Sequence, residues 1–343
     1  MLQYIAYCSG RVYDLSVWTK EEQNPPKPIL YEARPVVSDT MSDKTLNGVI
    51  PINKGKGVTS HDVVAKARRI LHEKRIGHSG TLDPLASGVL PLFIGFATRA
   101  IEYTSEGGKA YRAFMRLGVE TTTYDAEGEI VDERPVSNTI DAAALQAASA
   151  QFIGDILQTP PKYSALKIQG KRMYELARAG VEFTPKPRLV HIDAITIVSV
   201  NLPDVVLDIE CGSGVYIRSL AHDIGENLGT GAFLSNLVRT RSGPWELQDC
   251  ITLEELAEIA EKDELRDIMF AADICMTHLP AAILTKNSAR QLIQGLRLPV
   301  KLVHPYETLR AYTCEGDFVG ITRYDAETEL LAPVKMMLYE NVW

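Results

Sequence analysis

The densest run of residues whose types could do chemistry lies between Gly77 and Gly88 and centres on one carboxylate, Asp83. Gly80 and Gly88 permit tight backbone turns beside it. Asp83 precedes Pro84, and this pair also has a structural interpretation, because Asp is a favoured N-cap and Pro a favoured first residue of a helix. A lone carboxylate can otherwise act as a base or as a nucleophile. From the residues alone, the N-cap is the simpler interpretation.

The rest of the sequence narrows the chemistry that Asp83 could serve. No HExxH, P-loop or GxGxxG pattern is present, so nothing indicates a metal ion or a nucleotide. The five cysteines are an odd number without a CxxC pair, which fits neither a disulfide framework nor a zinc site. We therefore expect reduced thiols, no metal and no cofactor.

Charge is distributed unevenly along the chain. The formal net charge of −8 argues against a nucleic-acid partner, because binding phosphates requires Lys and Arg. Residues 54–116, however, hold eleven Lys and Arg against five Asp and Glu, and residues 162–188 hold seven against two. Tyr163 and Tyr174 lie within the second stretch, and such interleaving suits a phosphate backbone with stacked bases. Either stretch alone fits a solvated basic face, whereas the two together make RNA binding an equal alternative.

Strands with interspersed helices are expected to position these residues. A helix over 61–72 follows the N-cap residues Thr59 and Ser60, and alternation over 110–118 places Tyr111 on the apolar face of a strand. Further strands are expected at 88–94, 189–200, 204–211 and 232–240, and further helices at 140–152, before Gly229, at 250–264 and at 287–294. No strict βα repeat is present, so the predicted fold class is α+β.

The chain divides into three expected segments. Residues 1–40 contain four prolines and no sustained periodicity, which predicts a poorly ordered extension, and Met41 is expected to be the natural start. A catalytic domain is expected over 41–275 and a small domain over 276–343. No apolar run approaches the ~20 residues needed to cross a bilayer, and a signal peptide is not evident. We therefore expect a cytoplasmic protein with no membrane partner.

Five segments, in order, carry a resemblance to a known family. They read NKGKGVTS from Asn53, GHSGTLDPLASGVLP from Gly77, KAY from Lys109 through LGVETTTYDAEG from Leu117, PKYSALK from Pro161 and CGSGVYIRSL from Cys211. They resemble, respectively, the opening motif, the catalytic loop, the active-site tyrosine strand, the thumb insertion and the active-site arginine motif of the TruB family of pseudouridine synthases. Five ordered motifs are far more specific than one pattern. Asn53 and Gly55 stand where that family has Asp and Pro.

The resemblance, which runs from about residue 47 to the C-terminus, implies a fold and an activity. The fold is a mixed, largely antiparallel central sheet flanked by helices, with a thumb insertion at about 157–188 and a β-rich, PUA-like C-terminal domain. The activity is conversion of uridine 55 in the tRNA T loop to pseudouridine, by cleavage of the C–N glycosidic bond, rotation of the base and reattachment through carbon. The uridine is flipped out of its stack. The implied partner is the T arm of tRNA, with no cofactor and no required protein partner, and the protein is expected to be a monomer.

The same resemblance assigns the site. Asp83 is the essential group, as a nucleophile at C1′ or C6 or as a base toward the sugar. Arg218 pairs with Asp83 and lowers the pKa of its carboxyl group, and Tyr111 stacks on the flipped base and helps to remove the C5 proton. The remaining candidates are substrate-binding residues: His78, Tyr216, Leu237, Lys54, Lys162 and Lys167. Structural roles remain open for the same residues. Arg218 could be a helix-start arginine in solvent, His78 a loop histidine, and the lysines exposed surface residues. Tyr111, Tyr216 and Leu237 could be core residues.

Two other functions remain open. A non-catalytic RNA-binding protein on the same scaffold has no need of an intact set of Asp83, Tyr111 and Arg218. An acid/base hydrolase that uses Asp83 alone lacks a recognisable second carboxylate, and it leaves the basic segment 162–188 unexplained.

Overall fold

The computed structural model of the chain describes residues 46–104, 107–164, 166–168, 170–302 and 306–337. It also describes three short strands near the N-terminus: β1 (Tyr4–Ile5), β2 (Tyr7–Cys8) and β3 (Arg11–Val12). Strand β1 pairs in parallel with β19 (Lys301–Leu302), and β2 pairs with β3. The rest of the predicted extension over 1–40 lies outside the described residues, as does Met41.

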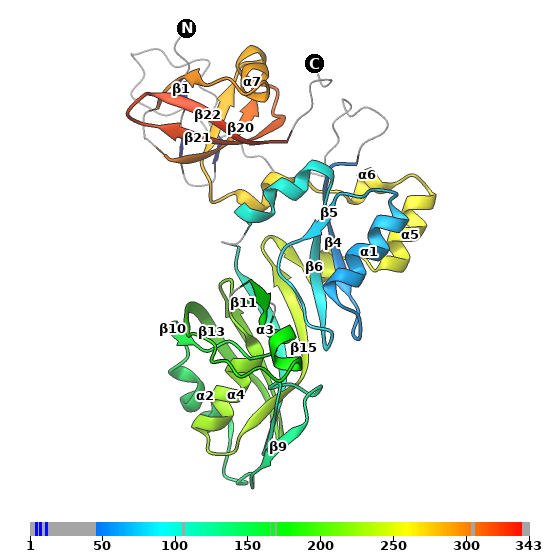
Figure 1. Cartoon of the computed structure of the whole chain (residues 1–343), viewed down its shortest axis with the longest axis vertical. Helices are drawn as coiled ribbons and strands as arrows, with labels where there is room; N and C mark the ends of the chain where they lie inside the picture. The colour runs from blue at the N-terminus through cyan, green and yellow to red at the C-terminus, as the bar shows by residue number, and fades with distance from the viewer. Residues whose placement is uncertain are drawn as a thin grey trace.

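A nine-stranded sheet forms the centre of the molecule (Figure 1). Its main path runs β10-β13-β14-β7-β15-β6-β4, with β16 beside β15 and β5 beside β6. The strands are β4 (Gly48–Lys54), β5 (Ile76–His78), β6 (Ala86–Ile94), β7 (Lys109–Leu117), β10 (Gly154–Gln158), β13 (Arg188–Asn201), β14 (Asp204–Cys211), β15 (Ala232–Ser242) and β16 (Trp245–Glu246). Every pairing is antiparallel except that of β15 with β6. The expected α+β class and largely antiparallel sheet are confirmed.

Amphipathic helices cover this sheet and close the main core. They are α1 (Ser60–Ile70), α2 (Ala142–Ala150), α4 (Ile217–Asn227), α5 (Leu253–Glu261) and α6 (Leu265–Ile268), with 3-10 helices η1 (Gly95–Tyr103), η2 (Leu247–Asp249) and η3 (Ala272–Met276). Thr59 caps α1 in a reciprocal pair with Asp62, as the sequence predicts. Helix α4 packs on β15 and α2 on β13. None of the described helices is long and apolar enough to cross a membrane.

Strand β7 runs through the middle of the sheet and shows the predicted alternation. Ala113, Met115 and Leu117 are buried in the main hydrophobic cluster, whereas Arg112 and Arg116 are exposed. After β7 the chain forms a two-stranded excursion, β8 (Val119–Thr121) with β9 (Ile130–Glu133). Between β10 and β13 it forms β11 (Lys167–Ile168), β12 (Lys171–Arg172) and α3 (Met173–Arg178). That second excursion occupies the segment expected to be the thumb.

The C-terminal segment builds its own five-stranded sheet, in the order β17-β20-β21-β22-β18, covered by one helix (Figure 1). The elements are β17 (Ala281–Leu284), α7 (Lys286–Ile293), β18 (Leu298–Pro299), β20 (Thr308–Thr313), β21 (Phe318–Asp325) and β22 (Leu330–Met336). A shared apolar cluster joins Val49 and Phe93 of the central sheet to Met276 and Ile321. The small sheet therefore shares an apolar cluster with the central one, to which η1 and η3 also contribute, and the predicted boundary at 275 stays a prediction.

Candidate active site

Asp83 lies in a turn that leads into β6. The backbone N–H of Ala86 donates to the carbonyl of Asp83 at 3.1 Å, and β6 begins at Ala86 itself. The short helix that would make Asp83 an N-cap is absent from this described stretch, so that structural interpretation is wrong. Pro84 suits the second position of such a turn, because its φ angle is already restricted. The carboxylate is therefore carried by a fixed turn between two strands.

Buried side chains hold the catalytic loop, residues 77–83, on both sides. Ser60, at the start of α1, accepts from the Leu82 N–H at 2.8 Å and donates to the Leu82 carbonyl at 3.0 Å. On the other side Arg239 of β15 donates to the Gly80 carbonyl at 3.0 Å and to the Val89 carbonyl at 2.7 Å. Arg239 is completely buried. A loop fixed by two different elements keeps Asp83 in place without help from a ligand.

Gly88 owes its identity to the parallel strand pair rather than to a turn. It lies inside β6 with φ +105°, where a Cβ atom would stand 2.2 Å from the carbonyl oxygen of Arg239. The expectation of a tight turn at Gly88 is wrong. The reason is the close approach of β15, which brings Arg239 against the loop.

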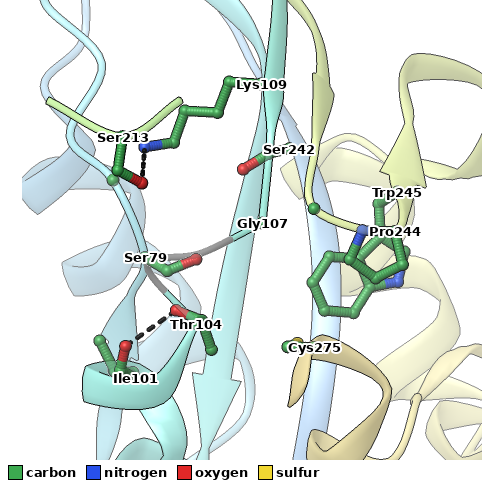
Figure 2. A pocket seen from close by; sticks show the side chains of 12 residues that line it. Ser79, Ile101, Thr104, Gly107, Lys109, Ser213, Ser242, Pro244, Trp245 and Cys275 are labelled. Carbon is green, nitrogen blue, oxygen red and sulfur yellow. Dashed lines mark hydrogen bonds between the residues drawn. The ribbon is translucent and has the colours of Figure 1, made fainter. Parts of the chain in front are cut away.

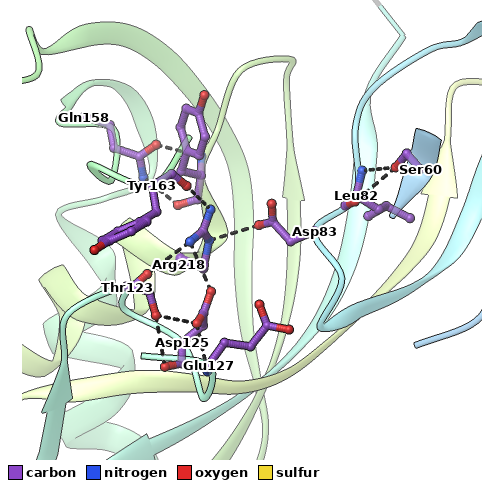
Figure 3. A network of polar contacts seen from close by, with 10 residues as sticks. Ser60, Leu82, Asp83, Thr123, Asp125, Glu127, Gln158, Tyr163 and Arg218 are labelled. Atoms are coloured by element: carbon purple, nitrogen blue, oxygen red, sulfur yellow. Dashed lines mark hydrogen bonds and ion pairs between the residues drawn. The ribbon is translucent and has the colours of Figure 1, made fainter. Parts of the chain in front are cut away.

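Arg218 gathers four groups around its guanidinium (Figure 3). Its Nε lies 3.0 Å from Oδ2 of Asp83, which confirms the expected pair. Nη1 donates to Oδ2 of Asp125 at 3.1 Å and to the Thr123 carbonyl at 3.1 Å, and Nη2 donates to the Tyr163 carbonyl at 2.9 Å. Only 7% of the Arg218 side chain is exposed, against 41% for Asp83. The arginine is thus locked in the interior while the carboxylate faces the opening.

Burial raises the pKa of Asp83 above its ordinary value of 3.8. Arg218 and Lys54 act in the opposite direction, and the negative charge of Asp125 adds to the upward shift. The lowering by Arg218 has the expected sign, and the net shift of this pKa is upward. The reason is that desolvation of the carboxylate outweighs the arginine.

Lys54 ends β4 and is buried, with 1% of its surface exposed. Its ammonium group donates to the carbonyls of Gly55 and Val58, at 2.9 and 2.7 Å, and so closes the loop that precedes α1. Desolvation lowers its pKa to about 8, while Asp83 raises it. This interior position does not fit the predicted contact with phosphate. Lys54 instead supplies a second cation near Asp83.

Tyr111 lies on the inward face of β7, 8% exposed, within the main hydrophobic cluster. Its hydroxyl group is hydrogen-bonded to Arg239 and feels the charge of Asp83. Desolvation raises its pKa above 10.0, so the phenol is neutral at ordinary pH. Tyr111 is therefore a core residue of β7, and this position is compatible with its predicted place beside Asp83.

The other predicted residues occupy different surroundings. Tyr216 precedes α4 and its phenol bonds to Ser164, while Leu237 of β15 is 7% exposed in the main cluster. His78 ends β5, and its buried Nδ1 has no hydrogen-bond partner among the residues that the structure describes. Lys162 is exposed, and Lys167 opens β11. The structure brings Asp83, Tyr111 and Arg218 together and leaves Lys162 and Lys167 on the excursion beyond them.

Sequence reasoning missed two residues at the centre of the site, Asp125 and Arg239. Asp125 is 2% exposed and accepts from Arg218, Thr123 and the Glu127 N–H. It lies inside a segment that the resemblance already covered. A carboxylate or guanidinium in an otherwise apolar strand or turn is the available signal, since such groups are rarely buried without a partner.

One group of side chains meets the geometry for a metal ion among the described residues. Glu120, His222 and Glu226 place their ligand atoms within 4.8 Å of one another. Arg134, however, forms ion pairs with both Glu120 and Glu226. The arginine already supplies the positive charge that a metal would bring, and the group lies outside the Asp83 site.

The amino-acid sequence matches two described protein families. Residues 68–217 match the TruB family pseudouridylate synthase (N terminal domain), and residues 218–277 match the tRNA pseudouridylate synthase B C-terminal domain. A protein named tRNA pseudouridine synthase B from Dehalococcoides mccartyi (strain ATCC BAA-2266 / KCTC 15142 / 195) is 41% identical over 82% of this chain and 94% of its own length. One with the same name from Burkholderia mallei (strain NCTC 10247) is 43% identical over 85% and 93%.

Solved structures share the fold. The chain resembles a structure titled an H/ACA RNP bound to a substrate RNA containing 2′-deoxyuridine, with a TM-score of 0.65 and 25% identity over 86% of this chain and 88% of that one. A second, titled the archaeal box H/ACA sRNP Nop10-Cbf5 complex, has a TM-score of 0.66 and 24% identity over 87% and 88%. With its ordered motifs and its relatives above 40% identity, this chain belongs to the TruB family of pseudouridine synthases.

Proposed function

We propose that this enzyme isomerises uridine 55 in the T loop of tRNA to pseudouridine, with Asp83 as its essential nucleophile or base. One observation carries the assignment. The Asp83 carboxylate is paired with the buried Arg218, and the charge of Asp83 acts on the buried phenol of Tyr111. The relatives are named tRNA pseudouridine synthase B, which supports tRNA as the substrate class.

The residues support a division of labour in the reaction. The bond between ribose C1′ and N1 of the uracil breaks, the base rotates, and a bond from C1′ to C5 forms. C5 then loses its proton and N1 takes one up, so that the base keeps its number of hydrogens. Asp83 acts in its charged form, as a nucleophile at C1′ or C6 or as a base toward the sugar. Arg218 and Lys54 oppose the desolvation that disfavours that charge. Tyr111 stacks on the base and assists removal of the C5 proton.

The substrate must leave its stack before this chemistry, at a cost of a few kcal/mol. Contacts from the excursion with Lys162 and Lys167 to the RNA backbone offset that cost, and His78, Tyr216 and Leu237 form the walls around the flipped base. The enzyme acts in the cytoplasm as a monomer, without a required protein partner. Isomerisation is atom-balanced and needs no oxidant, reductant or cofactor.

A pure RNA-binding role is less well supported than catalysis. A binder gains nothing from a buried ion pair that holds one carboxylate at an opening, because a carboxylate repels phosphate. Asp83, Arg218 and Asp125 form such an arrangement. The observation favours catalysis over binding alone.

The direct experiment measures tritium release from tRNA labelled at C5 of its uridines, followed by mapping of pseudouridine in the product. We expect release of one tritium per tRNA and a single new pseudouridine in the T loop. A transcript with cytidine at the target position is the matched control and should release nothing. Release at another position, or none with the wild-type protein, would overturn the proposal.

A further inference from the structure

One face of helix α4 holds the excursion that β8 and β9 form. Arg218, His222 and Glu226 are spaced four residues apart on this helix, so their side chains lie one above another. Arg218 donates to the turn between the two strands, and Glu226 forms an ion pair with Arg134, which follows β9. Between them, the ring of His222 stacks on the ring of Tyr124. The excursion is therefore fastened to α4 at three successive turns of the helix.

Tyr124 stands in the turn between β8 and β9 with an unusual backbone. Its φ angle is +62°, in the left-handed region that a large side chain rarely adopts. Its N–H donates to the Thr121 carbonyl at 3.2 Å, and its own carbonyl accepts from the N–H of Leu234 in β15 at 3.0 Å. A left-handed conformation at a residue other than glycine persists only where the surroundings determine it. The turn therefore depends on contacts outside itself.

The two neighbours of Tyr124 in the sequence both bind the guanidinium of Arg218. Nη1 of Arg218 donates to the Thr123 carbonyl and to Oδ2 of Asp125, at 3.1 Å each (Figure 3). Thr123 precedes Tyr124 and Asp125 follows it, so a change of φ at Tyr124 would move one acceptor relative to the other. The geometry of both hydrogen bonds therefore depends on the backbone of Tyr124.

His222 holds the ring of Tyr124. The two ring centroids are 3.9 Å apart, and the planes are inclined by 14°. Nδ1 of His222 lies 3.5 Å from Oε1 of Glu120 in β8, and 17% of the histidine side chain is exposed. The stack is thus a partly buried contact between the helix that carries Arg218 and the turn that carries Asp125.

The position of the Asp83 carboxylate depends on this side of the site. At the other end of the catalytic loop, Ser79 and Gly80 line a pocket (Figure 2). Asp83 itself is paired with Nε of Arg218, whose Nη1 and Nη2 are held by Asp125 and by backbone carbonyls. A guanidinium is planar, so fixing Nη1 and Nη2 also fixes the direction of Nε. A displacement of Asp125 would therefore displace the partner of Asp83.

We propose that Tyr124 and His222 are positioning residues of this enzyme. Their stack holds the turn that presents Asp125 to Arg218, and so it sets the guanidinium against Asp83. The inference rests on the proposed function, because it takes Asp83 as the reacting group. Neither ring needs to touch the RNA for this role. A stack that only stabilised the fold would affect unfolding alone, whereas a positioning stack also sets the rate of the chemical step.

The first test removes the stack from the helix side. His222→Ala should keep α4 intact, because alanine is the best helix former. We expect its single-turnover rate of tritium release at saturating tRNA to fall about ten- to a hundredfold, as a small misplacement of a catalytic group does. The Kd for tRNA should be unchanged, because no cationic side chain is altered. His222→Phe keeps a ring in the stack and should restore most of the rate.

Variants of Tyr124 separate the ring from the backbone. Tyr124→Phe keeps the stack and should retain the wild-type rate. Tyr124→Asn tolerates the left-handed backbone but removes the ring, so its rate should be as low as that of His222→Ala. Phe318→Ala is the matched control, because it removes a ring that packs on Tyr312 in the C-terminal sheet. It should lower stability in urea and leave the rate unchanged.

A double-mutant cycle asks whether the stack acts through Asp125. Asp125→Asn keeps the size of the side chain and removes the charge that pairs with Arg218. In that background His222→Ala should cause little further loss of rate, because both changes release the same guanidinium. Losses that multiply would overturn the inference, since the stack would then act by another route.

The inference and the proposed function can fail separately. A wild-type protein that releases tritium from tRNA while His222→Ala matches its rate overturns the inference and leaves the proposed function standing. A wild-type protein that releases none overturns both.

Discussion

Two buried arginines hold the two sides of the catalytic loop, and their surroundings have opposite charge. Arg218 forms ion pairs with two carboxylates, Asp83 and Asp125. Arg239 donates to the backbone carbonyls of Gly80 and Val89, and no ion pair to it is found among the described residues. The same type of side chain thus meets charged acceptors on one side and neutral acceptors on the other.

The difference separates two tasks. On the Arg218 side, desolvation and the opposing charges around the carboxylate set how readily Asp83 ionises. On the Arg239 side a second cation, Lys109, is close enough for the charge of Arg239 to lower its pKa. The Arg218 side is suited to chemistry on the uracil base, and the Arg239 side to holding the loop and the negatively charged RNA. Substitutions should therefore affect rate on one side and stability or binding on the other.

The largest effect is expected for Asp83→Asn, which keeps the size of the side chain and removes its charge. Turnover should fall by roughly a thousandfold or more, since neither a nucleophile nor a base remains. Binding of tRNA should persist, because the cationic side is untouched. Tritium release and a filter-binding assay measure the two quantities, and Asp208→Asn on the exposed face of β14 is the control. Near-normal turnover in Asp83→Asn contradicts the assignment.

A large loss of stability is expected for Arg239→Met. Two buried carbonyls lose their donor, which should lower the free energy of unfolding by about 2–6 kcal/mol. Arg241→Met on the same strand is the matched control, because Arg241 forms a partly exposed pair with Glu210 that contributes about 0–1 kcal/mol. Urea unfolding compares the two variants. Equal stability of both would show that the buried arginine does not hold the loop.

A smaller effect, visible in the pH dependence, is expected for Arg218→Lys. The Asp83 carboxylate must be charged to act, and the pKa of this group is raised by burial and lowered by Arg218. A shorter cation opposes the upward shift less, so the pKa should rise further. The acid limb of the single-turnover rate should then move to higher pH. Arg112→Lys is the control, because its partner Asp208 is on the exposed face, and it should leave the acid limb unchanged. An acid limb that does not move in Arg218→Lys would show that Arg218 does not affect the pKa of Asp83.

The smallest effect per residue is expected on the excursion that precedes β13. Replacing Lys162 and Lys167 with alanine should weaken tRNA binding and reduce the slope of log K against log salt by about 0.7–0.9 for each phosphate that is no longer neutralised. Turnover at saturating tRNA should be unchanged. Lys262→Ala serves as the control, and a slope equal to that of the wild type argues against binding of RNA by this excursion.

Much of the fold follows from local patterns in the sequence. The alternation of β7 and the capping of α1 by Thr59 were both predicted, because each depends on neighbouring residues. The structural interpretation of Asp83 failed because the chain enters β6 at once, which is decided by pairing with β4 and β15. The expectation of a tight turn at Gly88 was wrong for the same reason. Contacts between distant strands leave no local signature.

The site was predictable only in part. The resemblance located Asp83, Tyr111 and Arg218, and the ion pair between Asp83 and Arg218 is confirmed. The balance between desolvation and Arg218 in the pKa of Asp83 was not predictable, because desolvation depends on how the surrounding elements close around the carboxylate. Lys54 shows the same limit, since a lysine in a polar stretch gives no sign that it will be buried. Burial is a property of the assembled fold.

The hydrogen bond from Arg239 to the Gly80 carbonyl spans 159 residues of sequence. At a synthesis rate of about 5–20 residues per second, roughly 8–30 seconds separate the emergence of the loop from that of its arginine. During this interval the growing chain already carries Asp83 but lacks Arg239, and for most of it Arg218 as well. Under the proposed function, a competent catalyst is therefore assembled only late in translation, and a shorter nascent chain lacks the groups that are proposed to modify RNA.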